Sequence, residues 1–127
     1  MKIIIKVMLV FVGLIHLLPL VGVLGSERLS ALYGLRIDEP NLLILMRHRA
    51  VLFGLLGSYL LYAAFQPAHQ RIALIGAWTS VVSFLFFAGQ AGGYSAAIAK
   101  VFWLDVIAAV CLVLASVAVF LLRTNRS

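Results

Sequence analysis

The sequence predicts an all-α, polytopic membrane protein in which four transmembrane helices form one bundle. Of its 127 residues, 65% are hydrophobic and only 11% are charged. Soluble domains are on average about 45–50% apolar and about 25% charged, so this composition excludes a water-soluble globular fold. Disorder is excluded as well, because disordered chains have low hydrophobicity. Four apolar segments reach the length of about 20 residues that a helix needs to cross a bilayer.

The predicted spans are residues 3–24, 42–65, 72–92 and 101–122. Inside lipid every backbone polar group needs a partner within the protein, which leaves only helices and closed barrels. The segments show no alternation of period two and are too long for strands, so we predict helices. The connections and tails are short, and we expect residues 1–127 to form a single transmembrane domain.

The first segment has a second interpretation, as a cleaved signal peptide. Lys2 supplies a basic start, and a small-residue site precedes Ser26. The apolar run of about 22 residues is longer than the 7–15 residues usual in signal peptides, which favours a retained span. Pro19 cannot donate a hydrogen bond to the carbonyl of Ile15, so we expect the helix to open there.

A short helix is predicted between the first two spans. Ser26 is a candidate N-cap, apolar residues follow at i, i+3 and i+4, and Gly34 is a ready stop. We expect this helix to lie in the membrane interface. Pro40 and Asn41 then begin the second span.

Small and polar residues form one stripe on each of the last three spans, which predicts helix–helix contact faces. The second span contributes Arg47, Ala50, Gly54, Ser58 and Leu61; the third contributes Gly76, Thr79, Ser80, Ser83, Phe87 and Gln90; the fourth contributes Asp105, Ala108, Ala109, Leu112, Ala115 and Ser116. The opposite faces are rich in Leu, Val, Ile and Phe and suit lipid.

Ionisable side chains inside the spans are the candidate functional groups, because such groups are costly in hydrocarbon. With a rise of about 1.5 Å per residue they lie roughly 8–12 Å from the end of the bundle opposite both termini. They therefore form one polar layer in one leaflet. The candidate ligand-binding residues are His16, Arg47, His48, Asp105 and the polar neighbour Gln90.

Arg47 and Asp105 lead their stripes at similar depth, so we predict that they form an ion pair. Such a pair serves either to lock two helices together or to bind a ligand. Arg49 lies about 200° around the helix from Arg47 and is predicted to extend outward to the lipid headgroups. His48 lies at the flank, and His16 beside the proline kink forms the wall of a small cavity.

The basic residues indicate membrane contact rather than nucleic-acid binding, because they sit beside apolar runs. The net charge is +6, and five Lys and Arg residues fall on each side of the predicted membrane. Lys2 and Lys6 flank the first helix, which favours cytoplasmic termini. The single cysteine, Cys111, excludes an intrachain disulfide and is interpreted as a small buried hydrophobe.

Three functions remain open at this point. The first is a non-enzymatic protein that binds a lipid, a quinone-like molecule or a partner subunit at the polar layer. The second is a redox accessory subunit, with a quinone or with a haem b held by His16 and His48. The third is a component of a small transporter, formed as a homo-oligomer or with a partner. A metal site is not favoured, and no Gly-rich phosphate loop or Ser/His/Asp triad supports an enzyme.

Three stretches resemble a group of small bacterial four-helix membrane proteins and, more distantly, the DoxX-like proteins. They are residues 13–20 (GLIHLLPL), 32–34 (LYG) and 47–57 (RHRAVLFGLLG). The resemblance implies four spans in the bacterial inner membrane, and some DoxX-like members are associated with quinone-linked sulfur oxidation. Such sequences are sometimes named phosphopantetheine adenylyltransferase. We expect no such activity, because that soluble α/β enzyme needs a His-x-Gly-His-type motif that this chain lacks.

Overall fold

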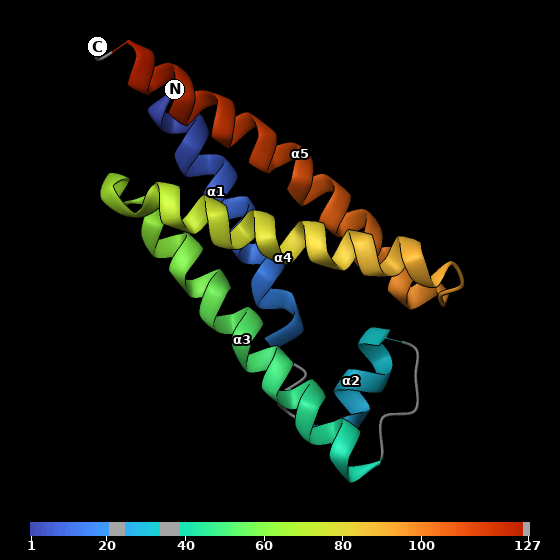
Figure 1. The fold of residues 1–127 in the computed structure, drawn as a ribbon. Helices are drawn as coiled ribbons and strands as arrows, with labels where there is room; N and C mark the ends of the chain where they lie inside the picture. Colours follow the sequence, from blue (N-terminus) through green and yellow to red (C-terminus); the bar gives the residue numbers. More distant parts are fainter. Residues whose placement is uncertain (21–24, 34–38, 126–127) are drawn as a thin grey trace.

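The computed structural model describes residues 1–20, 25–33 and 39–125, without the side chains of Ser26, Leu29 and Leu32. The described chain is helical, and four of its helices are long and apolar enough to cross a membrane. The α-helices are α1 (Lys2–Leu17), α2 (Ser26–Tyr33), α3 (Pro40–Ala64), α4 (Gln70–Ala91) and α5 (Ala96–Thr124), and a short 3₁₀ helix, η2 (Pro67–His69), joins α3 to α4 (Figure 1). The predicted helical class and the four long apolar helices are thus confirmed.

The end of the first helix is set by Pro19. Because Pro19 has no N–H, the carbonyl of Ile15 accepts a hydrogen bond from the backbone N–H of Leu18 instead. The chain tightens into a 3₁₀ turn over residues 18–20. The predicted opening of the helix at Ile15 is confirmed, and residues 21–24 of the predicted span lie outside the described residues.

The starts of α3 and α5 are set by side-chain caps. The carboxylate of Glu39 accepts hydrogen bonds from the backbone N–H groups of Asn41 (3.1 Å) and Leu42 (2.8 Å), which hold the pKa of Glu39 below its ordinary value. Pro40 follows in the first turn, as predicted. The hydroxyl of Ser95 accepts from the N–H of Ile98 (3.2 Å), so α5 begins at Ala96 rather than at residue 101.

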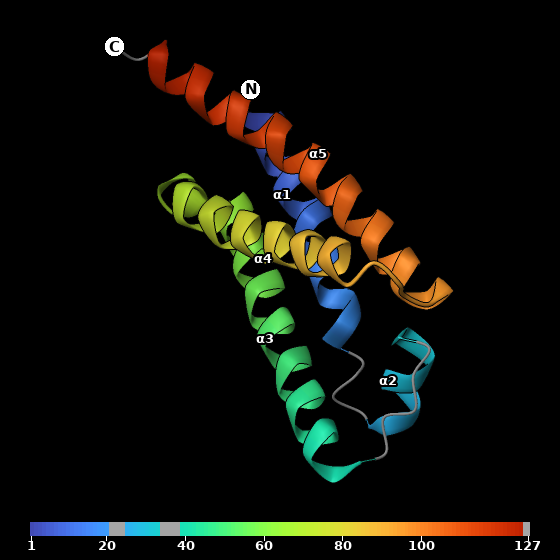
Figure 2. The same cartoon turned by 45° about the vertical axis from the view of Figure 1, so that its right-hand side comes forward.

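The short helix predicted between the first two spans is also present. It begins at Ser26, the residue predicted as its cap, and ends at Tyr33. The predicted stop at Gly34 lies outside the described residues. Figures 1 and 2 show α2 beside the start of α3, at the end of the molecule opposite the N- and C-termini.

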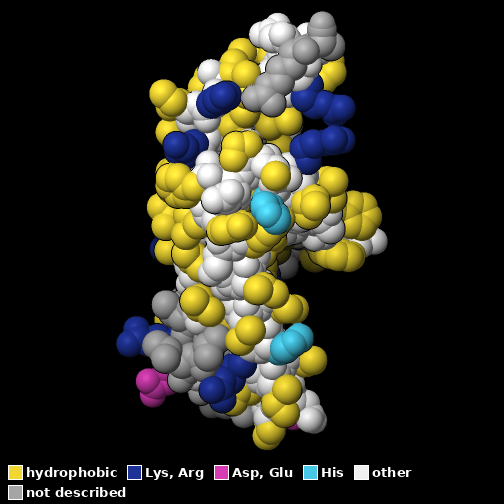
Figure 3. All heavy atoms as spheres, turned by 90° about the vertical axis from the view of Figure 1, so that its left-hand side faces the viewer, with side chains coloured by type: hydrophobic (Ala, Val, Ile, Leu, Met, Phe, Trp, Pro, Cys, Tyr) yellow, Lys and Arg dark blue, Asp and Glu magenta, His cyan; other side chains and the backbone are white. Residues whose placement is uncertain are grey.

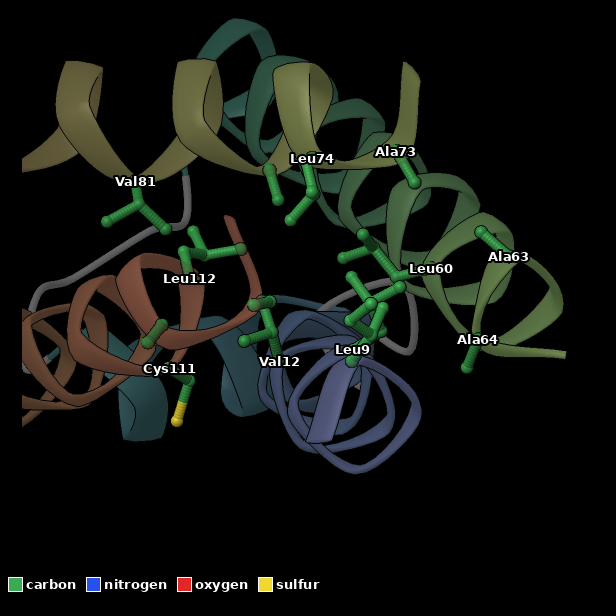
Figure 4. Close-up of a cluster of buried hydrophobic side chains, with 14 of the residues drawn as sticks. Leu9, Val12, Leu60, Ala63, Ala64, Ala73, Leu74, Val81, Cys111 and Leu112 are labelled. Atoms are coloured by element: carbon green, nitrogen blue, oxygen red, sulfur yellow. The ribbon is translucent and has the colours of Figure 1, made fainter. Parts of the chain in front are cut away.

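The helices pack around α1. Helix α1 packs against α3 and α5, and α4 crosses over α5 and α3 (Figures 1 and 2). Between them lies one apolar core, of which Figure 4 shows a part. Its largest fully buried side chains are Ile5, Leu9, Val12, Leu60, Val81 and Leu112. Cys111 is buried beside this core, as its interpretation as a small hydrophobe requires.

The contact face predicted for α5 is confirmed, and the one predicted for α4 is largely wrong. Asp105, Ala108, Leu112 and Ala115 are buried on α5. On α4 the buried residues are instead Ala73, Leu74, Ala77, Val81 and Ala88. Thr79 and Ser83 are exposed, because their hydroxyls donate to carbonyls of their own helix, those of Ile75 (2.8 Å) and Ser80 (3.0 Å). A hydroxyl satisfied in this way needs no neighbouring helix.

The surface separates apolar from basic side chains. In Figure 3 hydrophobic side chains cover most of the middle of the visible face, and Lys and Arg gather toward its two ends. Large exposed side chains of this apolar surface come from every long helix, for example Ile3, Leu55, Ile75 and Phe120. This is the distribution that a bilayer-spanning bundle needs.

Candidate functional site

A cavity of about 80 Å³ lies near the end of the molecule opposite the termini. Every α-helix of the described chain contributes to its wall. Its polar lining residues are His16, Tyr33, Arg49 and Asp105, and its apolar wall includes Pro19, Phe53, Phe84 and Leu104. The cavity is thus a small, largely apolar space that four polar side chains border.

Arg49 is the cation of this site, and two aromatic rings hold it there. Its Nη1 donates a hydrogen bond to the hydroxyl of Tyr33. Its guanidinium carbon lies 5.2 Å from the ring centroid of Tyr33 and 4.6 Å from that of Phe53. Cation–π contacts at such distances stabilise a desolvated guanidinium. Arg49 is therefore held half-buried with its charge in the cavity wall.

Asp105 faces the same cavity from α5 and is 9% exposed. The carboxylate of Asp105 and the guanidinium of Arg49 thus belong to residues that line one space. Among the described residues, none donates a hydrogen bond to that carboxylate, and the cavity lies against it. The two charged groups therefore share a space that a small polar group can enter and bridge.

His16 closes the cavity floor and is fully hydrogen-bonded. Its Nδ1 lies 2.9 Å from the carbonyl oxygen of Val12, and its Nε2 lies 3.0 Å from the hydroxyl of Ser80. A carbonyl can only accept, so Nδ1 carries a proton and donates it; in a neutral ring Nε2 then accepts from Ser80. The ring packs against Phe53, with the centroids 5.8 Å apart. This network fixes the ring of His16 and links α1, which carries it, to Ser80 of α4.

Tyr33 and Ser95 attach α2 to the bundle beside the cavity. Tyr33 is 4% exposed and packs against Leu43, Met46, Ile98 and Val101. The hydroxyl of Ser95 donates to the carbonyl oxygen of Tyr33 (3.1 Å) while it caps α5. Sequence reasoning missed both roles. A serine directly before a helical run is a recognisable cap signal, but its second bond to α2 depends on tertiary structure.

The predicted ion pair between Arg47 and Asp105 is wrong. Arg47 is exposed, and it lies on the face of α3 that also carries the exposed residues Val51 and Leu55. Arg49, which was predicted to extend outward, is the arginine that faces Asp105. The predicted polar layer thus has a different cation.

The reason is the phase of the contact face on α3. Its buried residues are Ala50, Gly54, Gly57, Leu60, Ala63 and Ala64. Helix α1 covers most of this face, α4 also packs on α3, and Tyr33 of α2 contacts Arg49 at its flank, so position 47 falls outside the face and position 49 on its flank. The predicted stripe began at Arg47 and assumed that its whole length was covered.

The structure brings together only two of the five predicted site residues, His16 and Asp105. His48 is exposed on α3, and Gln90 is exposed close to the end of α4; neither lines the cavity. An axial haem ligand needs an imidazole nitrogen with a free lone pair, and both ring nitrogens of His16 already have partners. The geometry therefore does not favour the haem pair of His16 and His48. The described residues hold no cluster of three or more His, Cys, Asp or Glu side chains suited to a metal ion.

Comparison of the chain with protein-family models, with curated proteins and with solved structures finds no match. The site is therefore interpreted from its own geometry.

Proposed function

We propose that this protein is a multi-pass membrane protein that binds the polar head of a lipid-soluble molecule, a lipid or a quinone-like compound, in the cavity between Arg49 and Asp105. One observation carries the proposal. A guanidinium and a carboxylate from different helices border the same small cavity, and none of the described residues donates a hydrogen bond to the carboxylate of Asp105. Groups so costly to bury are retained in spans chiefly where they serve a function.

The shape of the cavity supports a head group with an apolar tail. Pockets for whole drug-sized ligands measure about 300–1,000 Å³, so a space of about 80 Å³ admits only a small polar group. Leu18 lines the cavity and is 53% exposed, so the cavity wall continues into the apolar outer surface. A tail attached to the bound head can follow that surface among the lipid chains.

The chemistry of the wall defines the head. Arg49 donates hydrogen bonds and Asp105 accepts them, so the favoured head carries an oxygen acceptor and a donor a few ångströms apart. The rings of Phe53 and Phe84 suit a flat, unsaturated group. A quinol head, whose hydroxyl groups donate while its oxygens accept, and a hydroxyl-bearing lipid head both fit these requirements, whereas a partner subunit would have to insert a side chain.

We infer further that the protein lies in the bacterial cytoplasmic membrane with cytoplasmic termini. The supporting features are the four long apolar helices and the Lys2 and Lys6 flank of the first one. The sequence resemblance to DoxX-like proteins agrees with a membrane role near quinones. Retention of the protein in membranes after an alkaline carbonate wash is the expected result, and release into the wash would contradict membrane insertion.

The binding test uses decylubiquinol as the probe, because the reduced head carries hydroxyl donors, and counts bound molecules by native mass spectrometry. We expect saturable binding to detergent-purified wild-type protein. Arg49→Gln and Asp105→Asn should each weaken binding roughly tenfold or more, because a hydrogen bond to a charged group contributes about 1.5–3 kcal/mol. Arg47→Gln is the matched control, since it changes an exposed arginine two residues away.

Mass spectrometry of the lipid extract from the same preparations separates the two head classes. An isoprenoid quinone or a hydroxyl-bearing lipid that co-purifies with wild-type protein and is lost from Arg49→Gln identifies the ligand. Equal binding of decylubiquinol by wild-type, Arg49→Gln and Asp105→Asn proteins, with identical extracts, would overturn the proposed site.

A further inference from the structure

A second, larger cavity lies at the opposite end of the bundle, where the two termini meet the turn between α3 and α4. It measures about 370 Å³. Its rim carries four cations from three helices: Lys2 and Lys6 from α1, Arg71 from α4 and Arg123 from α5. None of the described residues that line it is acidic. We propose that this basic crevice binds the phosphate group of an anionic phospholipid.

The placement of the cations is unfavourable unless an anion binds among them. Lys2 and Lys6 stand four residues apart on α1, where like charges repel each other. Arg71 lies in the first turn of α4, where the helix dipole disfavours a positive charge. An anion in the crevice removes both penalties and interacts with Arg123 as well. The site thus has an electrostatic preference for an anion.

The floor of the crevice favours a phospholipid over a free phosphate ion. It is apolar, and it is built from Ile5, Ala64, Val119 and Leu122, of which Ile5 is 1% exposed. The ammonium group of Lys6 lies 5.2 Å from the ring centroid of Phe65, which holds one cation at the rim. A glycerophosphate fits this arrangement, with its phosphate at the rim and the start of its acyl chains against the floor.

The site is independent of the Arg49 cavity, and it rests only on the membrane location proposed above. Headgroup phosphates lie at the ends of spanning helices, and basic side chains there gain about 1 kcal/mol each from an anionic surface. A volume of about 370 Å³ lies within the range of ligand pockets. The crevice therefore lies at the level of the headgroups, and its volume suits a bound ligand.

The test titrates detergent-purified protein with dioleoylphosphatidylglycerol or dioleoylphosphatidylcholine and counts bound lipid by native mass spectrometry. We expect the wild-type protein to prefer phosphatidylglycerol. The double variant Arg71→Gln with Arg123→Gln should lose roughly 10- to 30-fold in affinity for it, as two surface cations contribute. Both arginines are exposed, so the variant is expected to retain its helical circular dichroism.

Two controls make the result specific. The double variant Arg28→Gln with Arg47→Gln removes the same charge from the opposite end and should keep wild-type affinity. Arg71→Lys with Arg123→Lys keeps the charge and should retain most of the binding. Equal affinity for both lipids, or an equal loss in the opposite-end control, would overturn the proposal. Competition by inorganic phosphate as strong as that by phosphatidylglycerol would assign the crevice to a soluble phosphate and overturn the lipid assignment.

Discussion

Arg47 and Arg49 have opposite environments although they stand two residues apart. A helix turns by about 100° per residue, so their side chains leave α3 about 200° apart and only one of them can face the bundle. Arg49 is the one that does, between the rings of Tyr33 and Phe53 and beside Asp105. Aromatic contacts, the Tyr33 hydroxyl and a nearby carboxylate together offset the cost of removing its charge from water.

His16 is the second polar group whose burial depends on specific partners. Replacing Ser80 by alanine removes the donor to its Nε2 and leaves that nitrogen without a partner in a buried site. We expect Ser80→Ala to reduce the free energy of unfolding by about 1 kcal/mol in a detergent denaturation measured by circular dichroism.

Ser83→Ala is the matched control for this prediction. The Ser83 hydroxyl is exposed and bonds only to its own helix, so its loss should change the unfolding free energy by less than about 0.5 kcal/mol. An equal effect of the two substitutions would mean that the hydrogen bond between His16 and Ser80 does not stabilise the contact between α1 and α4.

At the scale of elements, the backbones of α1 and α3 approach closely where the two helices cross. Gly13 and Gly57 face each other there. A methyl group added to Gly57 would lie 2.8 Å from the carbonyl oxygen of Gly13, and one added to Gly13 would lie 3.1 Å from that of Gly57. Small residues at such a crossing let two backbones approach, which is the main source of helix association in membranes.

Gly57→Ala should therefore force α1 and α3 apart. We expect a loss of about 1–3 kcal/mol in unfolding free energy, since the obstructing atom is backbone and cannot move aside alone. Gly89→Ala on α4 is the control: a methyl group there meets nothing within 4 Å, and alanine has the higher helix propensity. The account of the crossing fails if the two variants unfold at the same detergent concentration.

The helices could be predicted from the sequence because their lengths follow from hydropathy and their ends from single residues. Most of the helix boundaries could be predicted from Pro19, from Pro40 and from the lengths of the apolar runs. The start of α5 was placed too late, because the apolar signal begins after the cap at Ser95. Helix faces were harder to predict. Thr79 and Ser83 resemble contact residues in a sequence, yet backbone bonds within α4 satisfy them.

The cavity beside Arg49 and Asp105 was likewise predictable in its position along the helices but not in the helix faces that form it. That His16, Asp105 and an arginine meet at one level of the bundle could be predicted, because position along a helix follows from residue number. Which arginine faces inward could not, because it depends on where α1 and α4 pack on α3 and on where Tyr33 of α2 meets it. Tyr33 was predicted in the short helix, but its contact with Arg49 joins residues 16 positions apart through tertiary packing.

The whole molecule has a different chemistry at each end. At the end beside α2, one arginine and one carboxylate border a small, largely apolar cavity; at the end with the termini, four cations surround a larger crevice without an acidic residue among the described lining. Many exposed apolar side chains lie between them, as on the face that Figure 3 shows. A bilayer around this middle would place the first site within one leaflet and the second at the headgroups of the other.

The central claim is that Arg49, and not Arg47, interacts with Asp105 inside the bundle. A double-mutant cycle on the free energy of unfolding, with Arg49→Gln, Asp105→Asn and both together, measures that interaction directly. We predict a coupling of about 1 kcal/mol or more for this pair, and a coupling near zero for the parallel cycle with Arg47→Gln. A coupling near zero for Arg49 with a large one for Arg47 would contradict the account.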